Sequence, residues 1–343
     1  MKTSLGRTGL RVNRVGFGGI PIQRLSMDGA AAVLQAALEH GVDFIDTARG
    51  YTDSEEKIGR VLRSFPGRVT LATKSMARTR DEMFRDVEIS LRNLGVENID
   101  LYQCHNISSE DQLETVLGPG GAMEALTEAR DQGMIGHIGI TGHKPWVVKA
   151  AIHRYPFETI QIPFNMIETA AAGELLPLAR KKNLGTIAMK PVAGGAVRNV
   201  LLNLRFILTS GMDVVIPGMD RVDQVEENLS VLEELKPLSE EEAEVLEREK
   251  EELGDSFCRR CEYCMPCPEG LNISFLHLIG AYYFRYGLKD WAWERLQSLS
   301  KRYADCVGCG ECVRKCPYDL DTPAMFAELD RRIAEDRGKS GTD

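Results

Sequence analysis

The chain has 343 residues, with 42 Lys and Arg against 51 Asp and Glu, which gives a net charge of −9. Apolar residues make up 43% and charged residues 27%, values of an ordinary folded protein that exclude disordered, collagen-like and coiled-coil chains. The acidic balance argues against a nucleic-acid or anionic-membrane surface. We expect a cytoplasmic protein without a membrane span, because no apolar stretch approaches the roughly 18 residues that cross a bilayer and the N-terminus lacks a secretion signal.

The first two thirds of the chain alternate short apolar runs with amphipathic segments of helical period, which is typical of repeated βα units. Eight such pairs predict a closed (β/α)8 barrel over residues 1–235, because an open doubly wound sheet usually has fewer units. The expected strands are 12–18, 43–47, 69–74, 99–105, 135–140, 159–164, 184–190 and 213–217. The expected helices lie near 28–40, 54–64, 81–94, 120–132, 145–153, 173–183, 198–210 and 221–235.

A Glu-rich segment, residues 236–253, follows the last barrel helix and is typical of a solvated linker helix or a cover on the barrel. The remaining residues, 254–343, are expected to form a small, mainly helical domain, with helices near 271–287 and 290–303 and a frayed end over the last dozen residues. We expect its aromatic side chains to form its core: Tyr282, Tyr283, Phe284, Tyr286, Trp291 and Trp293.

Eight of the nine cysteines lie in two runs within this last domain. Such clustering, in a chain without a secretion signal, indicates metal binding rather than disulfides. In each run three cysteines at C-x2-C spacing precede a Cys-Pro pair. This is the pattern of ferredoxin-like domains, in which three thiolates hold one [4Fe–4S] cluster and the Cys-Pro thiolate ligates the other. We therefore expect two [4Fe–4S] clusters, the first on Cys258, Cys261, Cys264 and Cys316, and the second on Cys306, Cys309, Cys312 and Cys267.

The first run departs from this pattern. Only Met265 and Pro266 separate Cys264 from Cys267, whereas three residues precede the last cysteine of the second run. Either Cys267 still reaches the distant cluster, or the first run closes on itself. Two clusters in one domain imply electron transfer, and the alternatives are a zinc site or a purely structural pair of clusters.

Four polar residues stand at or just beyond the carboxyl ends of predicted strands, where barrels of this kind carry their active sites. They are Asp46, Tyr51, Lys74 and His105. Their motifs are Phe-Ile-Asp-Thr-Ala (44–48), Ala-Thr-Lys (72–74) and Leu-Tyr-Gln-Cys-His (101–105), preceded by Leu-Gly-Arg-Thr-Gly (5–9) and followed by Ile-Pro-Gly (216–218). In this order the motifs make residues 1–235 similar to the aldo-keto reductase superfamily. The resemblance implies that the four residues are a catalytic tetrad and that the substrate is a small carbonyl compound or alcohol.

The chemistry explains these residue types. Reduction of a carbonyl by hydride requires a proton donor, and tyrosine, with an ordinary pKa near 10, is a poor acid at neutral pH. An ammonium about 4 Å away, at an effective dielectric constant near 20, stabilises a phenolate by roughly 4 kcal/mol. We therefore expect Lys74 to make Tyr51 acidic and Asp46 to hold Lys74 charged, while His105 orients the carbonyl. The alternative is a structural Asp–Lys salt bridge with satisfied polar neighbours.

The resemblance also implies contacts to a nicotinamide cofactor. Gln161 and Asn165 on the sixth strand and His143 after the fifth match positions that contact the nicotinamide, and Met189 stands where the family places a stacking aromatic. Lys190 either adds a positive charge to the pocket or caps its strand.

The segment after the eighth strand argues against a preference for NADPH. Gly218 and Gln224 stand where NADPH-using members of the family have a lysine and an arginine on the 2′-phosphate. The backbone N–H groups of residues 218–221, with Arg221 as the cation, are an alternative phosphate site. Asn228 belongs to the family's Glu-Asn motif in this region and is a further cofactor-binding candidate.

The electron count leaves three schemes open. Nicotinamide delivers two electrons as hydride, a cluster passes one at a time, and the chain has no Rossmann or flavin motif. In the first scheme the barrel is an NAD(P)H-dependent carbonyl reductase and the clusters have a separate role. In the second, the clusters pass electrons from an external ferredoxin or flavodoxin to a substrate at the tetrad. In the third, the protein is a non-catalytic electron carrier or redox sensor.

Overall fold

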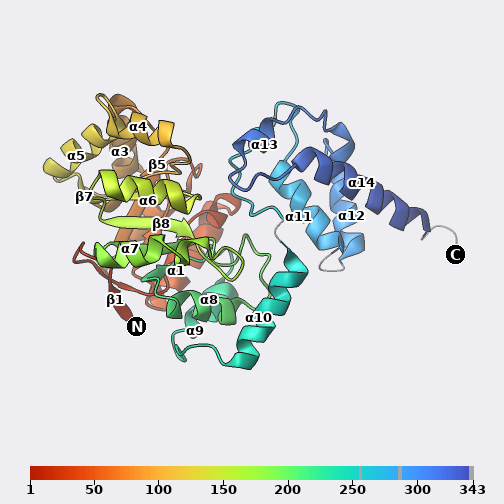
Figure 1. Ribbon diagram of the computed structural model, residues 1–343, viewed down its shortest axis with the longest axis horizontal. Coiled ribbons are helices and arrows are strands. Elements are labelled where there is room, and N and C mark those ends of the chain that lie inside the picture. Colours follow the sequence, from red (N-terminus) through yellow and green to blue (C-terminus); the bar gives the residue numbers. More distant parts are fainter. Residues whose placement is uncertain (255–256, 285–287, 340–343) are drawn as a thin grey trace. The chain divides into compact units, whose positions relative to one another are not determined.

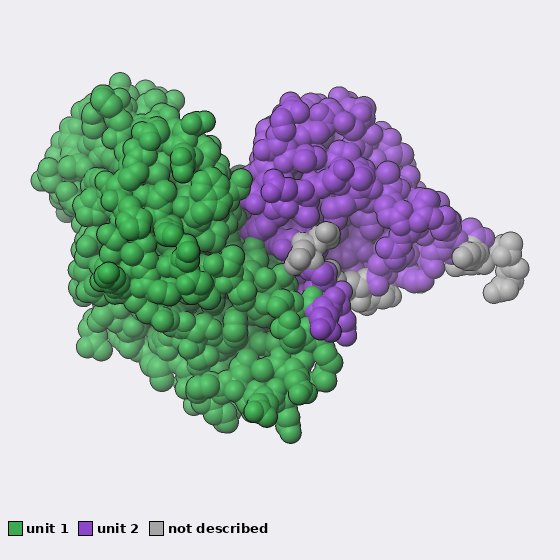
Figure 2. Space-filling view, viewed as in Figure 1, with its two compact units in different colours: residues 1–193, 197–250 green, residues 194–196, 251–343 purple. Residues whose placement is uncertain are grey.

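The computed structural model describes residues 1–254, 257–284 and 288–339. The chain divides into two compact units, one made of residues 1–193 and 197–250 and the other of residues 194–196 and 251–343 (Figure 2). Within the described ranges, none of the helices combines the length and the apolar character that crossing a bilayer requires.

The first unit contains eight parallel strands that neighbour one another in chain order. Parallel bridges from Val15 to Val215 and from Gly18 to Gly218 join the first of these strands to the last and close the barrel. The predicted (β/α)8 barrel is therefore confirmed. Its strands are β3 (Phe17–Gly18), β4 (Phe44–Asp46), β5 (Thr70–Ser75), β6 (Ile99–Cys104), β7 (Ile135–Thr141), β8 (Thr159–Pro163), β9 (Gly185–Met189) and β10 (Val214–Val215).

The expected first strand, residues 12–18, is wrong over its first half. Strand β2 (Arg11–Asn13) pairs antiparallel with β1 (Lys2–Ser4), and only β3 joins the barrel. The chain reverses between β1 and β2 at Gly6, whose positive φ of 53° and contact with the backbone of Gly185 leave no room for a side chain. Leu5 packs in the interior of the barrel, so the hairpin closes the end at which β9 begins.

Helices surround the strands (Figure 1), and the main apolar core lies between the two layers. The helix α4 was not expected from the sequence. It begins after Ser109, whose Oγ accepts a hydrogen bond of 3.2 Å from the N–H of Gln112, an N-cap that predicts a helix start. The helices are α1 (Met27–Glu39), α2 (Ser54–Leu62), α3 (Arg80–Leu94), α4 (Glu110–Leu117), α5 (Ala122–Asp131), α6 (Pro145–Arg154), α7 (Leu175–Lys181), α8 (Val200–Thr209) and α9 (Val222–Ser230).

The acidic helix α10 (Glu240–Leu253) packs on the barrel and is not a solvated linker. Its residue Glu249 is buried and accepts hydrogen bonds from the N–H groups of Arg198 and Asn199 and from the Asn199 side chain, at 2.7 Å for the last. Arg198 and Asn199 directly precede α8, so the carboxylate holds the segment that leads into that helix and lies at its positive end. Glu242, about two turns earlier on α10, forms an ion pair with the buried Arg205 of α8.

The second unit, as far as it is described, is helical, which agrees with the prediction. Tyr283 is fully buried in its core and donates a hydrogen bond of 2.7 Å to Asp336. The expectation of a frayed end is wrong for residues 332–339, because Ile333 is buried and the last helix continues to Lys339; Tyr286 and residues 340–343 lie outside the described residues. The helices are α11 (Ile273–Phe284), α12 (Lys289–Ser298), α13 (Glu311–Lys315) and α14 (Thr322–Lys339).

Candidate active site and cluster-binding segments

The four predicted catalytic residues come together at the carboxyl end of the barrel. Asp46 ends β4, Lys74 is the penultimate residue of β5, and His105 follows β6 directly. Tyr51 lies in the loop after β4. Its N–H donates a hydrogen bond to the carbonyl of Ala48, which forms a turn in this loop. Asp46 pairs with Ala72, two residues before Lys74, and Lys74 pairs with Gln103, two residues before His105. Because side chains two residues apart on a strand share a face, the three side chains lie on one face of the sheet.

The distances within this tetrad are short. The Lys74 ammonium donates to Asp46 Oδ1 at 2.6 Å and to the carbonyl of Thr47 at 2.8 Å. It also lies 5.0 Å from the centre of the Tyr51 ring. The rings of Tyr51 and His105 meet edge to face, with their centres 5.8 Å apart. One ammonium therefore donates to a carboxylate and lies beside the ring of a tyrosine.

The ion pair of the tetrad is removed from water, since Lys74 is 0% and Asp46 3% exposed, whereas Tyr51 is partly exposed. Burial raises the pKa of Asp46 and lowers the pKa of Lys74, and the charge of each opposes the shift of the other. Burial, reinforced by the positive charge of Lys74, also lowers the pKa of His105 well below its ordinary value. His105 is therefore a neutral imidazole at pH 7.

Gln161 lies within the barrel interior, behind the ion pair. Its Nε2 lies 3.3 Å from Asp46 Oδ1, and its Oε1 accepts a hydrogen bond of 2.8 Å from Gln103. Gln103 also approaches Asp46 Oδ2 at 3.4 Å, so the carboxylate is held by Lys74 and by two amides. Sequence reasoning did not select Gln103, although the two-residue period of β6 places it on the same face as His105.

The remaining residues expected near the nicotinamide lie at the ends of β8 and β9. Asn165 organises the loop after β8, because its Oδ1 accepts from the N–H of Glu168 at 2.9 Å and its Nδ2 donates to the carbonyl of Lys190 at 3.1 Å. Met189 packs in the barrel interior. Lys190 has a positive φ of 53°, and its charge lowers the pKa of both Lys74 and His143.

Two further residues lie beside the tetrad, in the segments that follow β5 and β7. Arg78, which the sequence did not single out, donates to the carbonyl groups of His105 and Asn106 at 2.9 and 3.0 Å. His143 is bonded through Nδ1 to Asn106 Oδ1 at 2.9 Å, and burial lowers its pKa well below the ordinary value. These contacts fix the chain just after β6, where His105 is presented. Cys104, the residue before it, is buried on the helix side, and burial raises the pKa of its thiol to about 12.

At the segment after β10, two of the predicted phosphate-binding N–H groups and the predicted cation are engaged within the protein. The N–H groups of Asp220 and Arg221 donate to Gln224 Oε1 at 2.8 and 3.3 Å. The guanidinium of Arg221 pairs with Asp223 at 3.0 Å. Gly218 approaches the backbone of the barrel's first strand through a bridge to Gly18, and Asn228 is buried on α9.

The two cysteine runs surround two adjacent cavities in the second unit. Burial, with repulsion from neighbouring thiols, raises the pKa of Cys264 to about 12, and the neighbours that contribute are Cys258, Cys261 and Cys316. The same four cysteines line one of the cavities, which we call the first cluster cavity. Three of them come from the first run, and Cys316 comes from the Cys-Pro pair of the second run.

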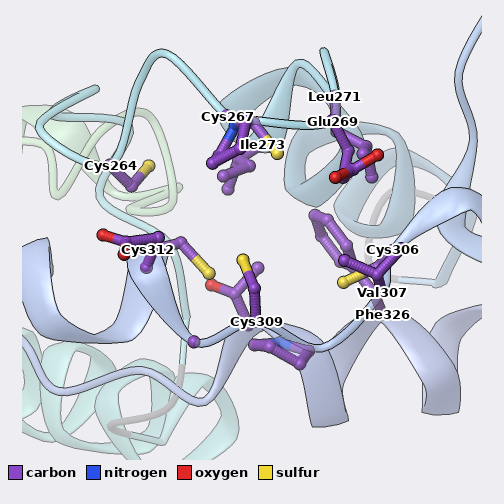
Figure 3. Close-up of a pocket in the computed structure, with 15 residues that line it drawn as sticks. Cys264, Cys267, Glu269, Leu271, Ile273, Cys306, Val307, Cys309, Cys312 and Phe326 are labelled. Atoms are coloured by element: carbon purple, nitrogen blue, oxygen red, sulfur yellow. The ribbon is translucent and has the colours of Figure 1, made fainter.

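The other cavity, the second cluster cavity, is lined by the remaining four cysteines of the two runs and also by Cys264. Cys267, from the Cys-Pro pair of the first run, reaches it despite the shortened spacing. The side chain of Cys312 lines both cavities, as does that of Cys264. Figure 3 shows the thiols that face this space, with Cys264 at its edge: Cys267, Cys306, Cys309 and Cys312.

The donor set fits clusters better than single ions. Among the described residues, no three His, Cys, Asp or Glu side chains converge on one metal ion, which a zinc site of four ligands at 2.0–2.3 Å would require. Four thiols spread around a cavity instead suit a cubane. The N–H of Arg260 also lies 3.3 Å from Cys258 Sγ, a contact of the kind that tunes clusters.

Comparison with known proteins gives two family matches. Residues 14–200 match the aldo/keto reductase family, and residues 257–321 match a 4Fe-4S dicluster domain. L-galactose dehydrogenase of Arabidopsis thaliana is 26% identical over 68% of this chain and 89% of its own length. An aldo-keto reductase structure from Bacillus halodurans has a TM-score of 0.63 at 24% identity, over 72% of this chain and 95% of its own. One from Klebsiella pneumoniae, in complex with NADP and acetate, has a TM-score of 0.62 at 24% identity, over 72% and 94%.

Proposed function

The chain belongs to the aldo/keto reductase family, and from that premise we propose that it interconverts a carbonyl and an alcohol with Tyr51 as general acid and base. The observation that carries the proposal is the position of the Lys74 ammonium, 2.6 Å from Asp46 and 5.0 Å from the centre of the Tyr51 ring. A buried cation at this distance favours the phenolate over the phenol, which is what a tyrosine needs to give up its proton to a developing alkoxide.

The other residues of the tetrad have supporting roles in this proposal. Asp46, held by Gln103 and Gln161, favours the charged form of the ammonium and so opposes the effect of burial, which lowers the pKa of Lys74. His105 is neutral, so it donates one hydrogen bond to the substrate oxygen without competing for the proton that Tyr51 transfers. The direction of proton movement then depends on which of the carbonyl and the alcohol is bound.

The positive charge of Lys190 near the tetrad favours a substrate with an anionic group. It lies close enough to lower the pKa of Lys74, His105 and His143. We expect a 2-oxo acid to be reduced with a higher kcat/KM than its methyl ester, and the Lys190→Met variant to lose that preference. An unchanged ratio in the variant would assign Lys190 to the structure of the β9 end alone.

The electron source is the second part of the proposal. A bound nicotinamide supplies a hydride, and a bound cluster supplies one electron at a time from an external ferredoxin or flavodoxin. The carboxylates of Asp220 and Asp223, and the use of two N–H groups by Gln224, disfavour a 2′-phosphate after β10. We therefore propose that any nicotinamide used is NADH rather than NADPH.

The experiment is anaerobic purification with iron and sulfide analysis, followed by reduction of a panel that includes 4-nitrobenzaldehyde and pyruvate. NADH, NADPH and dithionite-reduced methyl viologen are compared as donors for the wild type and for Tyr51→Phe. The proposal expects turnover with NADH or with the viologen and its loss in the variant. Full activity of Tyr51→Phe would overturn the role of the phenol. Reversible cluster reduction without turnover of any carbonyl would favour an electron carrier instead.

A further inference from the structure

Arg259 is a buried cation beside the first cluster cavity. Its side chain lines that cavity together with the cysteines at 258, 261, 264 and 316. It is 5% exposed and is the one Lys or Arg that is buried in the described part of the second unit. A buried cation is costly to desolvate, so its position beside the cavity calls for a reason.

The guanidinium is fixed in place from three sides. Its Nη1 donates to the carbonyl of Phe257 at 2.6 Å. It also stacks on the Phe257 ring, 3.9 Å from its centre, and on the Tyr318 ring, 4.6 Å from its centre. Phe257 precedes Cys258, and Tyr318 is two residues beyond Cys316. The charge is therefore held between the two segments that supply the first cavity with thiols.

The charged surroundings of the two cavities differ. The first cavity has Arg259 and the exposed Glu262 in its lining. The lining of the second cavity includes Glu269 and Glu311, both partly or fully open to water, and among the described residues it contains no Lys or Arg. Water and salt screen the exposed carboxylates, whereas the buried guanidinium acts at a lower effective dielectric constant.

We propose that Arg259 raises the reduction potential of the cluster in the first cavity relative to that of the cluster in the second. A [4Fe–4S] cluster gains one negative charge when it is reduced, and a nearby buried cation stabilises that form. The inference rests on the proposed function only in that both cavities hold clusters. The buried charge then shifts the distribution of an electron shared by the two clusters toward the first cluster.

The test is a redox titration of the anaerobically purified protein followed by electron paramagnetic resonance. Two neutral variants, Arg259→Met and Arg259→Gln, are compared with Arg259→Lys, which keeps the charge. Lys315→Met is the matched control, because Lys315 also adjoins a predicted ligand, Cys316, but is exposed. The Cys309→Ser variant identifies the signal of the second cluster.

We expect the first-cluster potential to move in the negative direction in either neutral variant that keeps the wild-type iron content. The second cluster should move less, and Arg259→Lys and Lys315→Met should stay near the wild type. An unchanged first-cluster potential in such a variant would overturn the inference. So would loss of the first cluster in both neutral variants but not in Arg259→Lys, since the charge would then serve cluster retention. Wild-type protein without iron would instead refute the clusters themselves.

Discussion

Replacing Lys74 with Met removes the charge that, in our proposal, activates Tyr51. The ammonium lies 5.0 Å from the centre of the Tyr51 ring. If the ring centre is taken as the position of the phenolate charge, an effective dielectric constant near 20 gives about 3 kcal/mol of phenolate stabilisation. Since about 1.4 kcal/mol corresponds to a factor of ten, we expect kcat to fall by about 10²- to 10³-fold.

The same variant also tests the stability of the buried pair. It leaves the Asp46 carboxyl 3% exposed and without its cation, which costs about 3–5 kcal/mol when one partner of a buried pair is removed. Asp46→Asn combined with Lys74→Met is the matched control, because a neutral pair avoids the buried charge. We expect the double variant to recover most of the free energy of unfolding but none of the lost kcat.

The assay is the initial rate of carbonyl reduction under anaerobic conditions, with the donor that supports the wild type, and unfolding in urea followed by circular dichroism. A folded Lys74→Met protein within threefold of the wild-type kcat would refute the reasoning. Recovery of kcat in the double variant would show that Lys74 and Asp46 act only as a structural pair.

Three further predictions concern stability and the clusters. As the pH falls below 6.5, the free energy of unfolding should decrease by up to about 1.4 kcal/mol per pH unit for each of His105 and His143. Burial lowers the pKa of both residues in the folded protein, so the unfolded chain binds the protons first. Urea unfolding between pH 5 and 7.5 measures this slope, and a flat profile would contradict it. Cys316→Ala should lose the first cluster and keep the second, and Cys267→Ala should do the reverse, each halving the iron content; loss of the same cluster in both variants would refute the crossed assignment. Glu249→Gln should lower the free energy of unfolding by about 1 kcal/mol, because the carboxylate stabilises the N-terminal end of α8. Urea unfolding measures this change, and a free energy equal to that of the wild type would contradict the role of Glu249.

The barrel was predictable because its pattern repeats. Each buried parallel strand is an apolar run, and each covering helix has one apolar face, so errors at single positions do not change the count. The prediction of the first strand was wrong for a local reason. Arg11–Asn13 has the alternation of a strand, but the chain reversal at Gly6 pairs it with β1 instead of with the barrel. Propensity gives the strand, and only the tertiary partner decides which sheet it joins.

The tetrad was predictable because strand ends and short motifs place it. The residues around it were not, because their roles depend on contacts between strands distant in sequence. Gln161 was expected at the nicotinamide, and no pattern in the sequence indicated the contacts of its amide with Asp46 and Gln103, which are 115 and 58 residues away in the chain. Similarly, the sequence shows that Gln224 stands where NADPH-using members of the family have an arginine that binds the 2′-phosphate. Only the structure shows that its side chain also takes up the N–H groups of Asp220 and Arg221.

In the second unit, the burial of individual side chains is the property that is hardest to predict from the sequence. Arg259 and Arg260 are neighbours of the same charge next to Cys258, and no pattern in the sequence separates them. The structure buries the first between two aromatic rings and leaves the second partly exposed. Because water weakens a charge by roughly fourfold relative to a protein environment of dielectric constant near 20, the two arginines should differ in their effect on a nearby cluster. Removing the charge of Arg260 should therefore move the first-cluster potential less than removing that of Arg259.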